Sequence, residues 1–166
     1  MSEFDYLHGR RCDVRQRALA NRIYQQERQR IFEFREGFIK VVSILAGSYA
    51  FAKMADPAIV GWCAIAITTS SAASLVFGFG TKARDSAKRS SEWALLERDI
   101  ELHGERRFTE EQVDQWTSRC NEIEAGEPAA HPGLFERANQ RACEAMGSKP
   151  GKVSWWRLNR PAIFIP

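Results

Sequence analysis

The pattern of hydrophobic positions is dominated by one continuous apolar stretch in the middle of the chain, residues 58–80 (AIVGWCAIAITTSSAASLVFGFG). It contains no Asp, Glu, Lys, Arg, His or Pro. A helix of roughly 20 predominantly apolar residues is long enough to cross the hydrocarbon core of a bilayer. The stretch therefore predicts a transmembrane helix.

A second and weaker apolar run, residues 41–52, comes just before it, and residues 53–57 (KMADP) between the two predict a short turn. The uncharged run is only twelve residues long, a length that also suits a buried helix of a soluble protein. Lys40 and Lys53 flank it, and both side chains are long enough to reach the membrane interfaces. With these flanks included, a first crossing over residues 37–54 and a helical hairpin are predicted.

Upstream of the apolar runs, residues 10–40 favour an amphipathic helix, preceded by a start that we expect to break at Gly9. Residues that favour helix are abundant, and apolar positions recur mostly at spacings of three, four or seven. Those positions are Val14, Ala18, Ile23, Tyr24, Ile31, Phe34 and Phe38. The other face carries Arg and Gln. Its simplest interpretation is a solvated face that also sets membrane topology, and the alternative is a surface for nucleic acid or anionic lipid.

Downstream, the helix of the second crossing is predicted to continue from Thr81 to about His103, with Trp93 as a packing residue outside the membrane. A capping-box pattern, Thr109 with Gln112 at the third helical position, then predicts a helix up to Gly126. A last helix is expected over residues 133–146. The tail from Ser148 ends in an apolar sequence that predicts contact with lipid or a partner through Trp155, Trp156 and Phe164.

These patterns predict an all-α integral membrane protein: a two-helix hairpin with a long N-terminal amphipathic helix and short C-terminal cytoplasmic helices. Four segments are expected. They are an Arg-rich N-terminal cytoplasmic helix (residues 1–36), the two-transmembrane hairpin (37–80), a cytoplasmic helical region (81–147) and the Trp- and Pro-containing tail (148–166).

Charge predicts the orientation. Eight arginines lie between residues 10 and 36, and a basic segment follows the second apolar stretch, whereas the connecting turn holds only Lys53 and Asp56. The positive-inside rule places both termini of this multi-pass protein in the cytoplasm. The flanking basic residues that carry this prediction are Arg35, Lys40, Lys53, Lys82, Arg84, Lys88 and Arg89.

Composition argues against several other classes. The net charge of +3 is modest, so a dedicated nucleic-acid binder is not expected. The N-terminus lacks the pattern of a secretory signal peptide. Four cysteines are scattered singly, which favours free thiols in a reducing compartment and no metal site. No nucleophile, phosphate-loop or metalloprotease motif is present, so neither an enzyme, a catalytic residue nor a cofactor is predicted.

The second apolar stretch has two different faces at 100° per residue. Small and weakly polar side chains gather on one face, and bulkier ones (Trp62, Ile65, Thr69, Val76 and Phe79) on the other. The small face either packs against a neighbouring helix or lines a water-filled path in an oligomer. Its residues are Cys63, Ile67, Ser70, Ser71, Ser74 and Gly78.

The order of these parts resembles the SLATT proteins, small bacterial and phage two-transmembrane proteins associated with conflict and defence systems. The resemblance covers residues 10–147. It rests on the Arg-rich leading helix, the short-looped hairpin, the basic exit and the tail residues 123–128 (IEAGEP) followed by Leu134, Ala138, Ala142 and Glu144. It implies a homo-oligomeric membrane effector of the bacterial inner membrane. Because a sensor or nucleotide-binding domain is not recognised in the chain, either a sensor or effector partner supplies the trigger or the chain is a freestanding relative with another role.

The leading hypothesis is therefore an oligomeric membrane protein that forms a pore or perturbs the bilayer in defence. A non-pore membrane adaptor or phage accessory protein, which binds a partner through its cytoplasmic helices and tail, is the alternative. A holin-type lysis protein and a soluble bundle that buries residues 58–80 are also considered.

Overall fold

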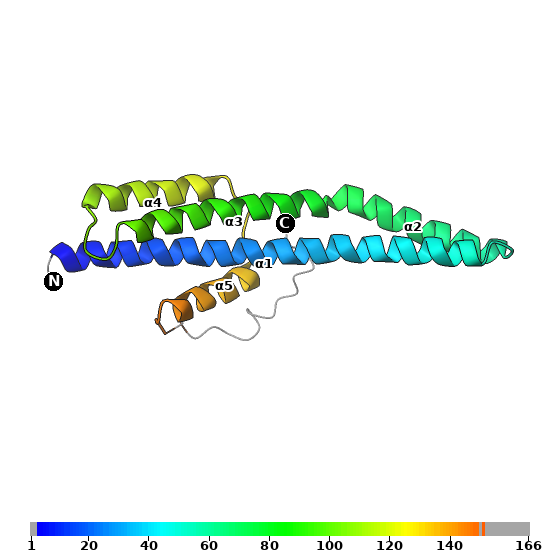
Figure 1. Cartoon of the computed structure of the whole chain (residues 1–166), viewed down its shortest axis with the longest axis horizontal. Coiled ribbons are helices and arrows are strands. Elements are labelled where there is room, and N and C mark those ends of the chain that lie inside the picture. Colours follow the sequence, from blue (N-terminus) through cyan, green and yellow to red (C-terminus); the bar gives the residue numbers. More distant parts are fainter. Residues whose placement is uncertain (1–2, 150, 152–166) are drawn as a thin grey trace. The chain divides into compact units, whose positions relative to one another are not determined.

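Every regular element in the described part of the chain, residues 3–149 and 151, is a helix in the computed structural model, which confirms the all-α fold class. The helices are α1 (Glu3–Ala52), α2 (Pro57–Phe77), α3 (Phe79–Leu102), α4 (Glu110–Ala125) and α5 (Pro132–Ala145) (Figure 1). They form two compact units. The core unit comprises Met1–Arg28 with Ser86–Pro166, and the apolar unit comprises Gln29–Asp85.

Helix α1 is longer than the sequence pattern predicted. It runs for 50 residues through Gly9 and Gly37 without interruption, so the expected break at Gly9 is wrong. An interior glycine costs a helix only about 1 kcal/mol relative to alanine, and the good helix formers on either side outweigh that cost. The predicted segment boundary at residues 36 and 37 lies inside this helix, and the units divide α1 at Arg28 instead.

The helix predicted to run unbroken from the second apolar stretch to His103 is divided at Gly78. This residue has φ 57° and ψ 40°, and its N–H donates to the Ser74 carbonyl at 3.0 Å. A left-handed backbone suits glycine because no Cβ clashes there. Helix α2 begins as the sequence suggested, with Pro57 at its first position and the Asp56 carboxylate accepting from the Ala58 N–H at 3.1 Å.

The core unit is organised around Trp93, which is fully buried. Its indole N–H donates to the Glu127 carboxylate at 2.8 Å, which satisfies the one polar group of the ring. Trp93 is thus the packing residue that the sequence predicted. Three helices contribute to the surrounding cluster, which consists of Val14, Ala18, Trp93, Leu96, Ile100, Val113, Trp116, Cys120 and Ile123.

The two C-terminal helices follow the predicted capping and spacing. The Thr109 hydroxyl accepts from the Gln112 N–H, and the Gln112 side chain accepts from the Thr109 N–H, so the capping box is present. The His131 side chain caps α5 by accepting from the Leu134 backbone N–H. The backbone N–H of His131 donates to the Tyr24 hydroxyl of α1 at 3.0 Å. Figure 1 shows α5 on the other side of α1 from α3 and α4.

The apolar unit pairs the C-terminal half of α1 with α2 through the short turn at residues 53–56. The Ser43 and Ser70 hydroxyl oxygens lie 3.1 Å apart between the two helices. Of the α2 side chains only Cys63 is buried. Large apolar side chains of both helices are exposed, so this unit lacks a core that covers them. They are Phe34, Phe38, Val41, Ile44, Leu45, Tyr49, Phe51, Trp62, Ile65, Leu75, Val76 and Phe77.

The packing of Trp93 leads to a test of the core unit. Trp93→Ala removes a fully buried indole and leaves a cavity, so we expect the free energy of unfolding to fall by about 3–5 kcal/mol. Thermal unfolding of the full chain in detergent, followed by circular dichroism, measures the change. Leu95→Ala on the same helix is the control, since Leu95 is half exposed. Equal losses in both variants would contradict this account of the core.

Candidate functional site

The exposed apolar helix α2 is the main candidate for function. Within the described residues, the helical stretch Pro57–Leu102, which joins α2 to α3, is the one long and apolar enough to cross a membrane. Almost none of its most apolar 18-residue window is buried, and Cys63 is the one buried side chain of α2. The predicted first crossing in α1 does not reach the same length and apolarity. The soluble-bundle alternative expected residues 58–80 to be buried, and the chain does not bury them within itself.

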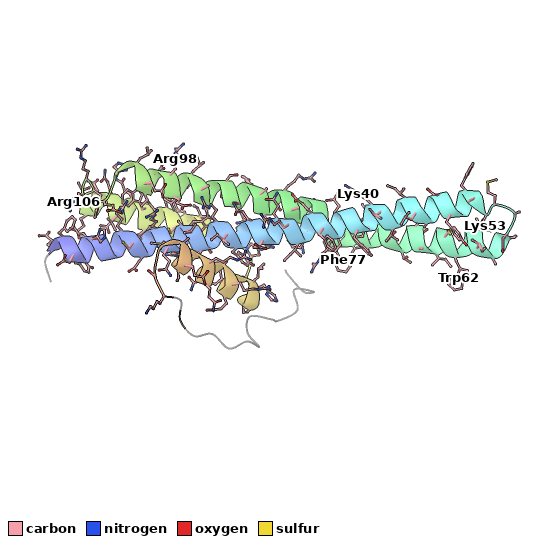
Figure 2. All side chains as sticks on the ribbon, turned by 60° about the horizontal axis from the view of Figure 1, so that its bottom comes forward. Lys40, Lys53, Trp62, Phe77, Arg98 and Arg106 are labelled. Atoms are coloured by element: carbon pink, nitrogen blue, oxygen red, sulfur yellow. The ribbon has the colours of Figure 1, made fainter. Side chains whose placement is uncertain are left out.

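The two predicted faces of α2 differ in their surroundings. On the small face Cys63 is buried, and Ile67, Ser70, Ser74 and Gly78 are half-buried, whereas Ser71 is exposed. On the bulky face Trp62, Ile65 and Val76 are exposed, and Phe79 is half-buried. The small face therefore lies largely against α1, as the packing interpretation expects. Figure 2 shows Trp62 pointing away from the helix pair.

Hydrogen bonds of the serines on α2 explain part of this arrangement. The Ser70 hydroxyl lies 3.1 Å from that of Ser43 and 3.0 Å from the Ile67 carbonyl oxygen, to which it donates. Gly47 of α1 faces Ile67, and a methyl group added at Gly47 would lie 4.0 Å from the Ile67 Cδ1. Small residues allow helices in a membrane to approach closely, and hydroxyl groups can bond between them. Ser70 therefore takes part in the contact between the two helices. That a serine of α2 lines a water-filled path stays a prediction, and Ser71 is the serine exposed enough to do so.

A groove of about 410 Å³ runs along the α1–α2 pair. Apolar surface predominates in it, with three seryl side chains and one lysine. The residues that line it are Ile39, Lys40, Ser43, Ile44, Ser71, Ser74 and Leu75. It is open to the surroundings of the apolar unit and is therefore accessible to whatever covers that unit.

Phenylalanine rings and cations gather where α2 gives way to α3; we call Phe32, Arg35, Phe77, Phe79 and Lys82 the collar. The Phe79 ring stacks on Phe77 at 5.5 Å and on Phe32 at 6.3 Å between centroids. The Arg35 guanidinium lies 5.8 Å from the Phe32 and Phe79 centroids, and the Lys82 ammonium lies 5.8 Å from that of Phe32. Burial lowers the pKa of Arg35, and at these distances the ring faces attract the cations.

Glu36 connects the collar to the groove. Its carboxylate pairs with Lys40 at 2.7 Å. It also lies against Gly80, where an added Cβ would be 2.6 Å from the Glu36 Oε2. The absence of a side chain at Gly80 therefore lets the carboxylate approach the first turn of α3, where negative charge is favoured.

The remaining predicted flanking residues lie in different surroundings. Lys53 is exposed beside the turn between α1 and α2, at the other end of this pair from Phe77 (Figure 2). Arg84 and Lys88 are exposed on α3, and Arg89 is half-buried. The tail residues Trp155, Trp156 and Phe164 lie outside the described residues.

The arginine face of α1 differs from the expectation. Arg11 and Arg28 are buried, and the Arg11 guanidinium donates to the Ile100 carbonyl at 3.2 Å. The solvated-face interpretation is therefore wrong for the core unit, because α3, α4 and α5 pack against this face. Ion pairs join it to all three helices: Arg10–Asp114, Arg15–Glu101, Arg17–Glu124, Arg22–Glu97 and Arg141–Glu27.

The cysteines and acidic groups do not form a reactive cluster in the described residues. All four cysteines are free thiols, and burial raises the pKa of Cys120 to about 11, so that thiol stays protonated at neutral pH. No group of three or more His, Cys, Asp or Glu side chains in this part of the chain could hold a metal ion.

The collar was missed by sequence reasoning, which placed Phe79 on the bulky face of the second apolar stretch and Arg35 among the flanking basic residues. Two spacings could have indicated it, since Phe32 with Arg35 and Phe79 with Lys82 are both three residues apart on helices. What no spacing could show is that the two pairs meet.

Comparison of the chain with protein-family models, with curated proteins and with the solved structures found no significant match. The resemblance to SLATT proteins therefore remains an interpretation of the sequence layout.

The ion pairs of α1 lead to a pH-dependent test. Glu97 is buried, which raises its pKa, and Arg22 at 2.7 Å opposes that rise. We expect Arg22→Gln to lower the free energy of unfolding by about 1–3 kcal/mol near pH 8, because it leaves a buried carboxylate without its partner.

The loss should be smaller at pH 4. A carboxyl whose pKa is higher in the folded than in the unfolded chain stabilises the fold at low pH, and that stability is lost as pH rises above 4.5 and through the raised pKa of the folded chain. Arg98→Gln, which breaks an exposed pair with Asp99, is the control. Unfolding of both variants and the unchanged protein in detergent at the two pH values measures the difference. A loss independent of pH would contradict the assignment.

Proposed function

We propose that the chain is an oligomeric protein of the bacterial inner membrane. In this proposal α2 and the adjoining half of α1 form a two-helix membrane hairpin, and the core unit lies on the cytoplasmic side. The assembled hairpins form a pore or otherwise perturb the bilayer, as an effector of a defence system. A separate sensor protein would supply the trigger.

The observation that carries the proposal is the exposed apolar surface of the α1–α2 pair. Trp62 is 73% exposed, Leu75 84% and Val76 80%. Contiguous apolar surface of this kind marks contact with lipid or protein. α2 has 21 residues and reaches about 31 Å at 1.5 Å per residue, which matches the hydrocarbon thickness of a bilayer.

The first crossing, in α1, rests on the pairing of α1 with α2. A short uncharged run can be accommodated when lysines at its ends reach the interfaces, and Lys40 and Lys53 are placed to do so. Basic residues are more numerous at the collar end than at the turn, which supports cytoplasmic termini.

Assembly is required for conduction because two helices cannot enclose a path. Ser71 is the exposed hydroxyl on the small face of α2, and rings of weakly polar groups can line a pore. The described span contains no Asp, Glu, Lys, Arg or His between Pro57 and Phe77, so we propose weak ion selectivity at most.

The second candidate function is a membrane adaptor without a pore, which presents the core unit and the tail to a protein partner. The Ser43–Ser70 contact favours this adaptor function, because the two hydroxyl groups bond each other within one hairpin and so do not face a water-filled path between hairpins. The net charge of the chain is only +3, so we propose no nucleic-acid partner for either function.

Membrane insertion is tested by fractionation of the expressed full chain. We expect the protein to stay in the membrane fraction after alkaline wash and high salt and to be extracted by detergent. Ile65→Arg with Thr69→Arg places two charges near the middle of the apolar span, at about 2.5–3.5 kcal/mol each, and should move most of the protein out of the membrane. Recovery of the unchanged protein in the soluble fraction would contradict the proposal.

Pore formation is tested by dye leakage from liposomes that contain the purified protein. If Ser71 faces a water-filled path, Ser71→Leu should lower the leakage rate several-fold, because it makes the path apolar and narrower. Ala72→Leu is the matched control, since Ala72 is exposed and adjacent but on another side of the helix. Equal leakage from both variants, with oligomers of unchanged mass, would remove Ser71 from the path. Oligomers that never leak would favour the adaptor.

A further inference from the structure

We propose that the groove between α1 and α2 and its basic end bind one anionic glycerophospholipid as a specific ligand. One acyl chain would lie in the groove, and the phosphate would lie on the side chains of Lys40 and Lys82. This proposal rests on the membrane placement proposed above and adds a defined ligand to it. Because Ser71 lines the groove, the bound lipid is an alternative to a water-filled path at Ser71.

The shape and chemistry of the groove fit an acyl chain. Its walls are mainly apolar, from Ile39, Ile44 and Leu75, and its seryl groups are small enough to leave space. The groove has a volume of about 410 Å³ and is open along its length. A flexible chain that is itself apolar can fill such a space without a buried polar group of its own.

The groove leads directly to a basic end. Lys40 is part of its lining, and Lys40 pairs with Glu36, whose carboxylate lies against Gly80. The Lys82 ammonium lies 5.8 Å from the centroid of the Phe32 ring, and Phe32 is one helical turn before Glu36 on the same side of α1. The groove, the Glu36–Lys40 pair and the collar are thus one continuous surface of the apolar unit.

The charge of this end favours an anionic headgroup. Arg35, Lys40 and Lys82 supply three positive charges, and Glu36 supplies one negative charge. The Lys40 side chain remains 69% exposed although it pairs with Glu36, so its ammonium can bond a phosphate as well. Basic pockets between transmembrane helices on the cytoplasmic side are suited to anionic lipid headgroups.

The same charges argue against a second copy of the chain as the occupant. All copies in one membrane have the same orientation, so a neighbouring hairpin in the groove would bring its own basic end close to this one. Like charges in a partly desolvated interface repel each other. A zwitterionic lipid also fits this basic end less well, because the positive charge of its ammonium group cancels the negative charge of its phosphate.

Lipid binding is measured on the purified full chain in detergent micelles, with phosphatidylglycerol and phosphatidylcholine as competing probes, by native mass spectrometry of bound lipids. We expect the unchanged protein to retain phosphatidylglycerol in preference. Lys40→Gln with Lys82→Gln should reduce that preference by on the order of tenfold, since it removes two of the three positive charges at the basic end.

Lys53→Gln with Lys88→Gln is the matched control, because it removes two exposed lysines that lie outside the groove. The control should keep the preference. An equal loss in both double variants would overturn the site, since it would reduce the effect to general charge attraction.

A groove-filling variant separates the lipid from a protein occupant. Ser74→Leu should displace the bound lipid and leave the oligomer mass unchanged. If it changes the oligomer mass and leaves the lipid preference intact, the groove holds a second copy and the proposal fails. The melting temperature of the core unit confirms that each variant folds.

These outcomes are distinct from those that test the membrane placement. A protein that needs detergent for extraction but shows no lipid preference contradicts only the lipid site. A protein recovered without detergent contradicts both.

Discussion

The physical constraint on which this structure depends is that an apolar helix left uncovered by its own chain needs a cover other than water. Residues 58–80 bear no charge, and α2 buries only Cys63. Apolar surface transferred from water is worth roughly 25 cal/mol per Å², so side chains such as Leu75 and Val76 strongly favour lipid or a protein partner. The division of the chain into an apolar unit and a core unit reflects this constraint.

Helix α1 satisfies two opposite requirements along one continuous backbone. In the core unit its arginines pair with carboxylates of α3 and α4, its Glu27 pairs with Arg141 of α5, and its apolar residues join the cluster around Trp93. In the apolar unit its outward side chains are largely apolar. Arginine suits the first role because its long apolar stem packs while its guanidinium bonds at the edge.

The break at Gly78 lies where the composition of the chain changes from apolar to charged. The left-handed glycine ends α2, and the rings of Phe77 and Phe79 on either side of it stack on each other. Arg35 and Lys82 lie beside this stack, which places aromatic rings and cations together at the end of the apolar span. Aromatic and basic residues favour membrane interfaces because each combines an apolar part with a polar or charged one.

The sequence by itself determined the elements whose causes are local. These are the uncharged stretch of α2, the Asp56–Pro57 start, the Thr109–Gln112 capping box and the buried face of α4, because caps and periodicity depend on near neighbours. Only the tertiary structure decided the roles of α1's arginines and of the collar. Arg22 meets Glu97, and Phe32 meets Phe79, across separations of many residues, and periodicity on one helix does not reveal which surface of another helix will cover it. The tertiary structure also decided that α1 continues through Gly37 and that α2 ends at Gly78. Glycine is tolerated inside the helix at the first position and ends the helix at the second, so the residue type alone does not distinguish the two outcomes.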